Sequence, residues 1–243
     1  MNPVLVEVLR GAELESSHRG AIAVLDADGA VLASLGEIDR PIFPRSAVKL
    51  LQALPLVESG AAERLGLTDA ELVLACASHN GEEAHVQTAA GMLAKAGLDA
   101  AALECGAHWP LLDTATRALA AAGRQASALH NNCSGKHSGF VCLACALPRH
   151  GVDLRQFAKG YVNPVHPVMR EVTAALQAVT GFDAKSAPRG TDGCSIPTYG
   201  IALRQLARGF ARVGTGVGLR EGRVAPAPRD CECAVHGRGK RPF

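Results

Sequence analysis

The segment HNNCSGKHSGF at residues 130–140 gathers groups that can do chemistry: a thiol, a lysine amine and two imidazoles, set among Gly, Ser and Asn. It could cradle a phosphate, hold a cysteine nucleophile or bind a metal ion. A phosphate-binding loop of the P-loop type requires Gly-x-x-x-x-Gly-Lys-Ser/Thr. Here Gly135-Lys136 is followed by His137, and the position five before Gly135 is His130 rather than glycine. The phosphate cradle is therefore excluded.

Two chemical interpretations of this loop stay open. Cys133 at the start of a helix would have a lowered pKa, as a cysteine nucleophile needs. A metal site would need a ligand from another loop, because Cys133 with Lys136 or His137 supplies only two ligands. Cys194 in GTDGCSIP, flanked by turn residues, is the natural supplier. Without either chemistry, the loop would be a helix N-terminus held by Asn and Ser caps.

A second candidate is Ser46-x-x-Lys49 in FPRSAVK, the only Ser-x-x-Lys of the chain. Positions i and i+3 share a helix face, so the lysine amine can reach the serine hydroxyl. A partly desolvated lysine loses its proton and becomes a base, while the helix N-terminus favours negative charge on the serine. The spacing predicts a serine nucleophile activated by lysine. The alternative is an exposed lysine and a serine that merely begins the helix.

Ser78 follows the apolar run LVLACA and precedes a helix that starts near Glu82. A serine at such a junction is usually an N-cap, although strand-to-helix junctions also carry exposed catalytic serines. His79 and His85 are expected to be surface or capping histidines.

A small antiparallel sheet and a run of helices are expected to position these groups. Alternating apolar residues predict strands at residues 4–9, 21–25 and 30–35, the last two as a hairpin. The stretch from Thr68 to Glu71 has the form of a capping box, and the run after it suits a helix or a buried strand. Apolar periodicity edged by Gly or Pro predicts helices from about residue 45 to 60 and at 82–97, 111–123, 138–150, 165–180 and 197–212.

The composition describes an ordinary soluble globular protein of 243 residues, 48% apolar and 20% charged. With 25 basic and 23 acidic residues spread along the chain, there is no electrostatic case for nucleic acid or an anionic membrane surface. No signal peptide is evident, and no segment has the roughly 20 apolar residues of a membrane span. We therefore expect a cytoplasmic protein with small-molecule partners and eight reduced cysteines.

Four long segments give the sequence a resemblance to a known family. They are FPRSAVKLLQALPLVESGAA, LACASHNGEEAH, HNNCSGKHSGF and GTDGCSIPTYGIAL. In this order they resemble the asparaginase II family, the inducible, thermolabile L-asparaginases of the Rhizobium type. The resemblance runs from about residue 3 to residue 212.

The resemblance implies an α+β fold similar to that of serine β-lactamases and penicillin-binding proteins, with helices beside an antiparallel sheet. It implies hydrolysis of the side-chain amide of L-asparagine to L-aspartate and ammonia, by a homodimer. Ser46 with Lys49 looks like the first of two Ser–Lys pairs, and Ser78 looks like the serine of the second. Ser46 is favoured as the nucleophile, with neutral Lys49 as its base.

A zinc ion is also implied by the resemblance, with three ligands: Cys133, Lys136 and Cys194. Lysine is an unusual ligand because its amine must be deprotonated. The zinc is expected to anchor the site or orient the substrate rather than to supply hydroxide.

Three further residues are predicted to bind the substrate. Asp192 is expected to pair with the ammonium group of asparagine, and Arg45 with its carboxylate. His137 is expected to lie nearby.

After residue 212 the sequence departs from the family, which continues with further strands and a lysine segment before a Gly-Ala-Glu-Gly motif. Residues 1–212 are expected to form an incomplete asparaginase II-like domain whose sheet lacks its C-terminal strands. Residues 213–243, rich in Arg, Gly and Pro, are expected to be a disordered, non-homologous tail from truncation or frameshift. In that case Ser78 would lack its lysine.

Two other functions stay open. The first is an inactive remnant that still binds zinc or asparagine. The second is a penicillin-recognising serine hydrolase, suggested by Ser-x-x-Lys alone. The loops that carry Cys133 and Cys194 argue against the second.

Overall fold

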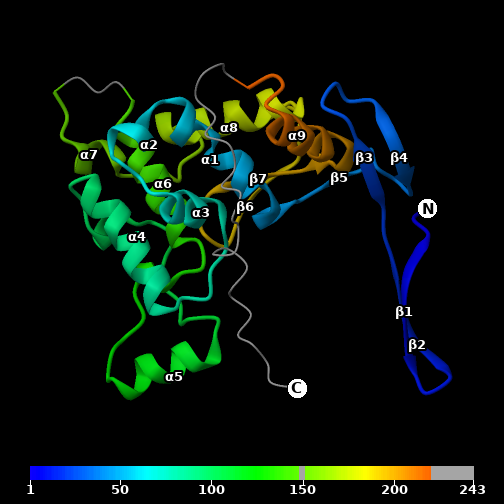
Figure 1. The fold of residues 1–243 in the computed structure, drawn as a ribbon, viewed down its shortest axis with the longest axis horizontal. Helices are drawn as coiled ribbons and strands as arrows, with labels where there is room; N and C mark the ends of the chain where they lie inside the picture. The colour runs from blue at the N-terminus through cyan, green and yellow to red at the C-terminus, as the bar shows by residue number, and fades with distance from the viewer. Residues whose placement is uncertain (148–150, 220–243) are drawn as a thin grey trace. The chain divides into compact units, whose positions relative to one another are not determined.

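The computed structural model describes residues 1–147 and 151–219, drawn as a ribbon in Figure 1. These residues divide into two compact units, which are considered separately. The first unit contains Met1–Pro44, Leu176–Arg189 and Tyr199–Leu219. The second contains Arg45–Ala175 and Gly190–Thr198, and it holds every residue predicted to do chemistry.

The first unit begins with two antiparallel hairpins, β1 (Val4–Arg10) with β2 (Glu13–Arg19), and β3 (Ile22–Leu25) with β4 (Val31–Leu35). The second hairpin is the predicted one. Its turn is closed by the Asp26 carboxylate, which accepts hydrogen bonds from the backbone N–H groups of Gly29 and Ala30. The sequence prediction missed β2, because ELESSHR lacks an apolar alternation and all seven residues are exposed.

Two short strands and a helix complete the first unit. Strand β5 (Pro41–Ile42) pairs antiparallel with β8 (Ile201–Ala202), and helix α9 (Leu203–Thr215) then packs on β3. The helix predicted at 197–212 therefore begins later, because its first residues are extended. Helix α9 also runs through residue 212. Residues 220–243 lie outside the described part, so the predicted tail stays a prediction.

The second unit consists mainly of helices and carries the predicted capping box. The Thr68 hydroxyl accepts from the Glu71 backbone N–H, and the Glu71 carboxylate accepts from the Thr68 N–H. The run that follows is therefore a helix rather than a buried strand. The helices of the unit are η1 (Arg45–Val48), α1 (Lys49–Glu58), α2 (Ala61–Arg64), α3 (Asp69–Cys76), α4 (Glu83–Lys95), η2 (Ala100–Ala102), α5 (Asp113–Ala121), η3 (Ala128–His130), α6 (Ser134–Ala144) and α7 (Leu154–Ala158).

Three elements cross the boundary between the units. Helix α8 (Pro167–Thr180) begins in the second unit and ends in the first, and the paired strands β6 (Arg189–Thr191) and β7 (Pro197–Tyr199) each contribute residues to both. The loop between β6 and β7 carries Cys194.

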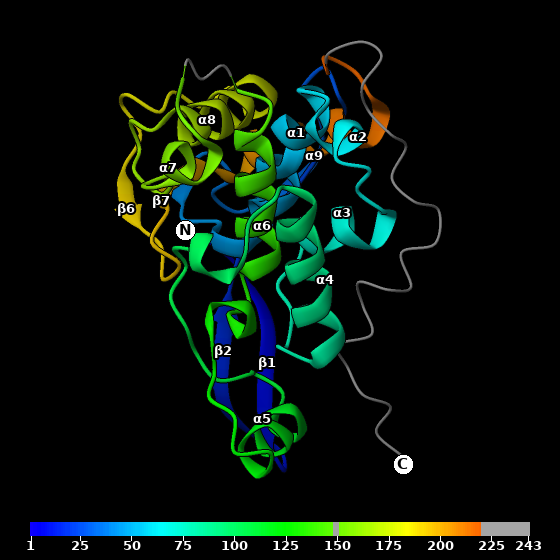
Figure 2. The same cartoon turned by 90° about the vertical axis from the view of Figure 1, so that its left-hand side faces the viewer.

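Helix α6 is the centre of the second unit: all eleven of its residues are buried, and it packs against α1, α3 and α4 (Figure 2). Its apolar residues join a core that includes Leu93 and Met169. Close approach to α3 depends on Gly135, where an added Cβ would stand 2.5 Å from the Leu74 carbonyl oxygen. The sequence HNNCSGKHSGF therefore starts a helix with no exposed face.

Helices beside small antiparallel sheets confirm the predicted α+β class. The six cysteines of the described residues are all free. None of the described helices is both long enough and apolar enough to cross a membrane.

The contact at Gly135 predicts that Gly135→Ala lowers the free energy of unfolding by about 1–3 kcal/mol, because the methyl group overlaps backbone that cannot move aside. Gly91→Ala is the matched control, since it is also helical and its Cβ would stand 3.6 Å from its nearest neighbour, Glu71. It should gain about 0.5–1 kcal/mol from helix propensity. Urea unfolding of both variants measures the difference, and equal stabilities would contradict the packing described for α6.

Candidate active site

The predicted site residues come from four segments of the second unit. Ser46 lies in η1, and Lys49 is the first residue of α1. Ser78 follows the end of α3. Arg45 also lies in η1, and the remaining residues lie around the N-terminus of α6 and in the loop between β6 and β7. The Lys49 amine has hydrogen bonds to two of the other segments.

Lys49 is 1% exposed, and its amine is surrounded by oxygen atoms. Nζ lies 2.7 Å from Ser78 Oγ, 2.9 Å from the Ala77 carbonyl oxygen and 3.5 Å from that of Asn132. Burial lowers the pKa of this amine, while the Cys133 thiol raises it and Lys136 lowers it further. The site thus holds a lysine whose proton is more easily lost than that of an exposed lysine.

Ser46 does not make the predicted hydrogen bond with Lys49. Its side chain is exposed and bonds no other described residue. The physical reason is that a buried amine needs hydrogen-bond acceptors. The acceptors lie in the segment that follows α3 and in the loop before α6, and none of them lies in η1. The structure therefore pairs Lys49 with Ser78.

Ser78 was expected to lack the lysine of the family's C-terminal segment, and this stays a prediction. In the structure Ser78 bonds a different lysine, Lys49, which lies 29 residues before it in the chain. Ser78 is itself exposed, so its hydroxyl has the amine on one side and is open to solvent.

His79 was expected to be a surface or capping histidine, and it is buried, with 4% exposure. Its Nδ1 accepts from the Gly81 N–H at 3.1 Å, so the neutral ring carries its hydrogen on Nε2 and donates to Ser134 Oγ at 2.8 Å. Its backbone N–H donates to the Asn132 carbonyl oxygen at 3.2 Å. These bonds fasten the Ser78 loop to the loop that begins α6. Burial, followed by the charge of His85, lowers the pKa of His79 to about 3.

The three predicted metal ligands are brought together and are all buried. Lys136 Nζ lies 3.1 Å from Cys194 Sγ, and the two thiols of Cys133 and Cys194 interact directly. The hydrogen bond from Cys194 lowers the pKa of Cys133 to about 6 against the effect of burial, and Lys136 and Lys49 assist. The same hydrogen bond raises the pKa of Cys194 to about 11. Of the two thiols, Cys133 is thus the one that loses its proton more easily.

This donor set fits a zinc ion, because thiolates are ligands that zinc prefers and the site is shielded from water. No three His, Cys, Asp or Glu side chains among the described residues are grouped to hold a metal ion by themselves. The predicted set supplies two cysteines and needs the Lys136 amine as its third donor.

Arg45 and Asp192 pair with each other: Nε lies 2.6 Å from Oδ1. The guanidinium is 63% exposed, whereas the carboxylate is 10% exposed. Asp192 Oδ1 also accepts from the Gly193 N–H at 2.8 Å. Arg45 has φ +49°, a backbone conformation that residues other than glycine rarely adopt. Two opposite charges therefore stand side by side near Cys194.

His137 is fully buried in α6. Its Nδ1 lies 2.6 Å from the hydroxyl of Tyr161, a residue that sequence analysis did not single out. Burial lowers the pKa of His137 to about 4, although Cys194 acts in the opposite direction. A fully buried ring is poorly placed for the substrate contact that was expected of it.

A comparison with models of protein families decides the family. The model of L-asparaginase II matches residues 6–241. The chain belongs to the L-asparaginase II family. The match continues past residue 212, where the sequence resemblance was expected to end. No curated protein matches the chain.

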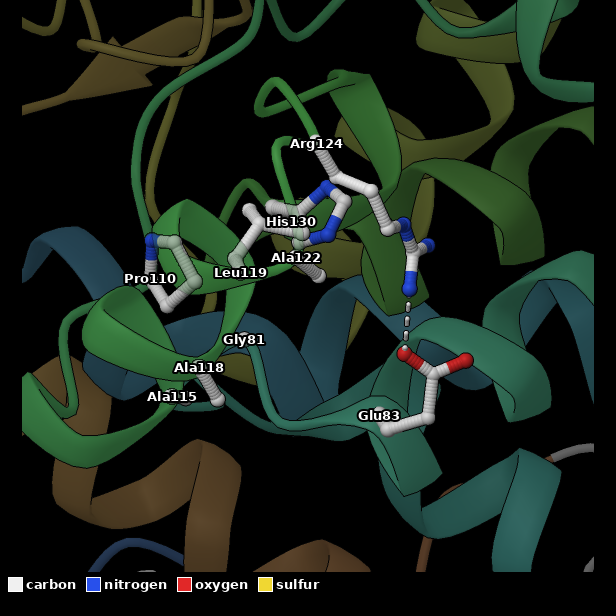
Figure 3. Close-up of a pocket in the computed structure, with 9 residues that line it drawn as sticks. All are labelled: Gly81, Glu83, Pro110, Ala115, Ala118, Leu119, Ala122, Arg124 and His130. Carbon is white, nitrogen blue, oxygen red and sulfur yellow. Dashed lines mark hydrogen bonds and ion pairs between the residues drawn. The ribbon is translucent and has the colours of Figure 1, made fainter.

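This L-asparaginase II family member also has a small cavity, of about 140 Å³, between α5 and the loop after Ser78 (Figure 3). Its walls include Gly81, Leu119 and His130, and the ion pair of Arg124 with Glu83 borders it, with a separation of 3.4 Å. None of the predicted site residues lines this cavity.

The pKa of His79 predicts that stability falls in acid. An unfolded histidine titrates near 6.5 and the folded one near 3, so the unfolded state binds the proton first and stability is lost as the pH falls below about 6.5. At pH 5 the loss from this residue is on the order of 2 kcal/mol.

Urea unfolding at pH 7 and pH 5 measures this loss. His79→Gln should lose less stability between the two pH values than the unmodified protein, and His18→Gln, at an exposed position of β2, should lose the same amount. An unchanged pH dependence in His79→Gln would show that this ring is not the group that titrates.

Proposed function

We propose that this asparaginase-like hydrolase converts L-asparagine to L-aspartate and ammonia with a serine nucleophile and a lysine base. Membership of the L-asparaginase II family supports the reaction. The 2.7 Å contact between the buried Lys49 amine and the exposed Ser78 hydroxyl carries the assignment of residues.

The surroundings of Lys49 suit a neutral amine. Burial lowers the pKa of the amine and so favours its neutral form, while the Cys133 thiol, which also bonds it, acts in the opposite direction. A neutral amine has two N–H groups and one lone pair. The two N–H groups have two carbonyl acceptors, those of Ala77 and Asn132. The lone pair is then left for the Ser78 hydroxyl, which donates to it. In this arrangement the amine is ready to accept the proton as the serine oxygen becomes a nucleophile.

The proposed reaction uses Ser78 and Lys49 in both halves. Ser78 Oγ attacks the side-chain carboxamide carbon while its proton passes to Lys49 Nζ. The amine then gives this proton to the leaving nitrogen, and ammonia departs from an acyl-serine. A water molecule, deprotonated by the same amine, cleaves the ester, releasing L-aspartate and restoring Ser78. Ser46, whose hydroxyl is exposed near the same helix end, is the alternative nucleophile.

Arg45 and Asp192 are proposed to bind the amino-acid end of the substrate. A free α-amino acid carries an ammonium and a carboxylate on neighbouring atoms. The ion pair of Arg45 with Asp192 presents the two complementary charges next to each other. Exchange of this pair for the substrate would keep every charge paired.

A zinc ion held by Cys133, Lys136 and Cys194 is part of the proposal, supported by their burial and by the low pKa of Cys133. When bound, such an ion supplies positive charge that orients substrate and fixes the loops. The chain itself contributes the sulfur pair and the deprotonated amine.

We also propose that the fold is related to that of the serine β-lactamases. The support is a Ser-x-x-Lys at the start of a helix that packs on the buried α6, with the lysine hydrogen-bonded to a serine of another loop, Ser78. We further propose that the sheet is incomplete, because every residue of β1 and β2 is exposed and a two-stranded hairpin is marginally stable alone.

An ammonia-release assay with L-asparagine tests the roles of the residues. Lys49→Met and Ser78→Ala should each lower kcat at least about 10³-fold, because base and nucleophile act as a unit. Ser46→Ala should retain most activity. Lys159→Met, at an exposed position, is the control for loss of a lysine.

Activity in Ser78→Ala together with its loss in Ser46→Ala would make Ser46 the nucleophile. No ammonia from the unmodified chain with zinc retained would favour an inactive binding protein. Acylation or hydrolysis of a penicillin would favour the third function.

Zinc binding is tested separately by metal analysis after dialysis against zinc. Cys133→Ser and Cys194→Ser should bind less than about a tenth of the zinc held by the unmodified protein, since a hydroxyl is a far poorer zinc ligand than a thiolate. Cys145→Ser, outside the proposed site, is the control and should keep full occupancy. Full zinc binding by both site variants would contradict the proposed ligands.

A further inference from the structure

His137 and Tyr161 form a buried polar pair, and both residues are 0% exposed. His137 directly follows Lys136, one of the proposed zinc ligands. His137 comes from α6, and Tyr161 follows α7. The Tyr161 oxygen has two partners: the Glu104 backbone N–H at 2.9 Å and His137 Nδ1 at 2.6 Å.

The direction of these hydrogen bonds is fixed by counting hydrogens. The Glu104 N–H can only donate, so the tyrosine oxygen accepts there. The single hydroxyl hydrogen of Tyr161 then has one acceptor among the described residues, His137 Nδ1. If Nδ1 were the donor instead, the hydroxyl hydrogen would be buried without an acceptor. Nδ1 is therefore bare, and the neutral ring carries its hydrogen on Nε2.

Glu104 holds the tyrosine in place with two contacts. Its backbone N–H meets the tyrosine oxygen, and its carboxylate accepts from the Gly160 N–H at 2.6 Å, one residue before Tyr161. Gly160 has φ +80°, in the region that favours glycine, so the turn into Tyr161 has a defined conformation. Phe140 packs against both rings, with centroids 5.6 Å from His137 and 6.3 Å from Tyr161.

The opposite ring nitrogen, His137 Nε2, is buried and has no hydrogen-bond partner of normal geometry among the described residues. The Cys194 thiol lies close enough to this ring to interact with it electrostatically. The ring on which Tyr161 fixes the N–H at Nε2 thus interacts with a proposed metal ligand.

We propose that Tyr161 is a positioning residue that locks His137 as the Nε2–H tautomer, so that His137 is a hydrogen-bond donor beside Cys194 and not a metal ligand. A nitrogen that carries hydrogen has no lone pair for a metal ion. The chain then offers three ligands, Cys133, Lys136 and Cys194, instead of four. A site with three protein ligands keeps a position open, whereas four would close it.

The tautomer depends only on the hydrogen bonds of Tyr161, while its meaning for the metal rests on the proposed zinc site. The two are therefore tested separately. Nitrogen NMR of the full chain labelled with ¹⁵N-histidine distinguishes a protonated from a bare ring nitrogen, with His137 assigned through its backbone resonances.

In the unmodified, metal-free protein, Nε2 should be protonated and Nδ1 bare. Protonation of Nδ1 would overturn the proposal, whether or not the protein is an asparaginase. On addition of Zn²⁺ alone, Nε2 should keep its hydrogen. Loss of that hydrogen would show that His137 binds the metal ion and would also overturn the proposal.

Tyr161→Phe removes the hydroxyl that donates to His137 Nδ1. The ring should then no longer be held as the Nε2–H tautomer, and a signal of the Nδ1–H tautomer should appear. Tyr199→Phe removes the chain's other tyrosine hydroxyl, which is also buried, and should leave the His137 signals unchanged. An unshifted His137 spectrum in folded Tyr161→Phe would refute the role of the tyrosine. Should that variant fail to fold, the measurement on the unmodified protein still decides.

Discussion

The burial of the Lys49 amine is the constraint on which the rest of the second unit depends. A lysine inside a protein is costly unless its amine is hydrogen-bonded. Here the acceptors are oxygen atoms of Ala77 and Ser78, in the segment after α3, and of Asn132, in the loop before α6. One side chain therefore ties three segments together, and the same burial that requires these contacts lowers its pKa.

The same logic extends to α6, a helix with polar residues on every side and no exposed face. Several polar groups at its start have specific partners. The Cys133 N–H donates to the Asn131 side chain, Ser134 is bonded by His79, and His137 is bonded by Tyr161. Buried polar networks of this kind allow few alternative arrangements. The pairs of side chains that could do chemistry are thus also the pairs that fix the packing.

Local signals in the sequence predicted the elements well where those signals were strong. The capping box at Thr68 and the turn at Asp26 are determined by side chains that bond neighbouring backbone, so both are found as predicted. Strand β2 was missed because all but one of its residues are polar and all are exposed. The short strand β8 was mistaken for helix because pairing with β5, more than 150 residues earlier in the chain, decides its conformation.

For the site, the sequence by itself determined which chemical groups are present and, through four long segments, the family. Only the tertiary structure decided which of them meet. In the structure Lys49 is hydrogen-bonded to Ser78 rather than to Ser46. His79 is buried, and Tyr161 is hydrogen-bonded to His137. The physical reason is that these contacts join residues far apart in sequence, up to 83 positions for Lys49 and Asn132. The partner of a buried donor is the acceptor that lies beside it once the core has packed. Spacing along the sequence does not determine which acceptor that is.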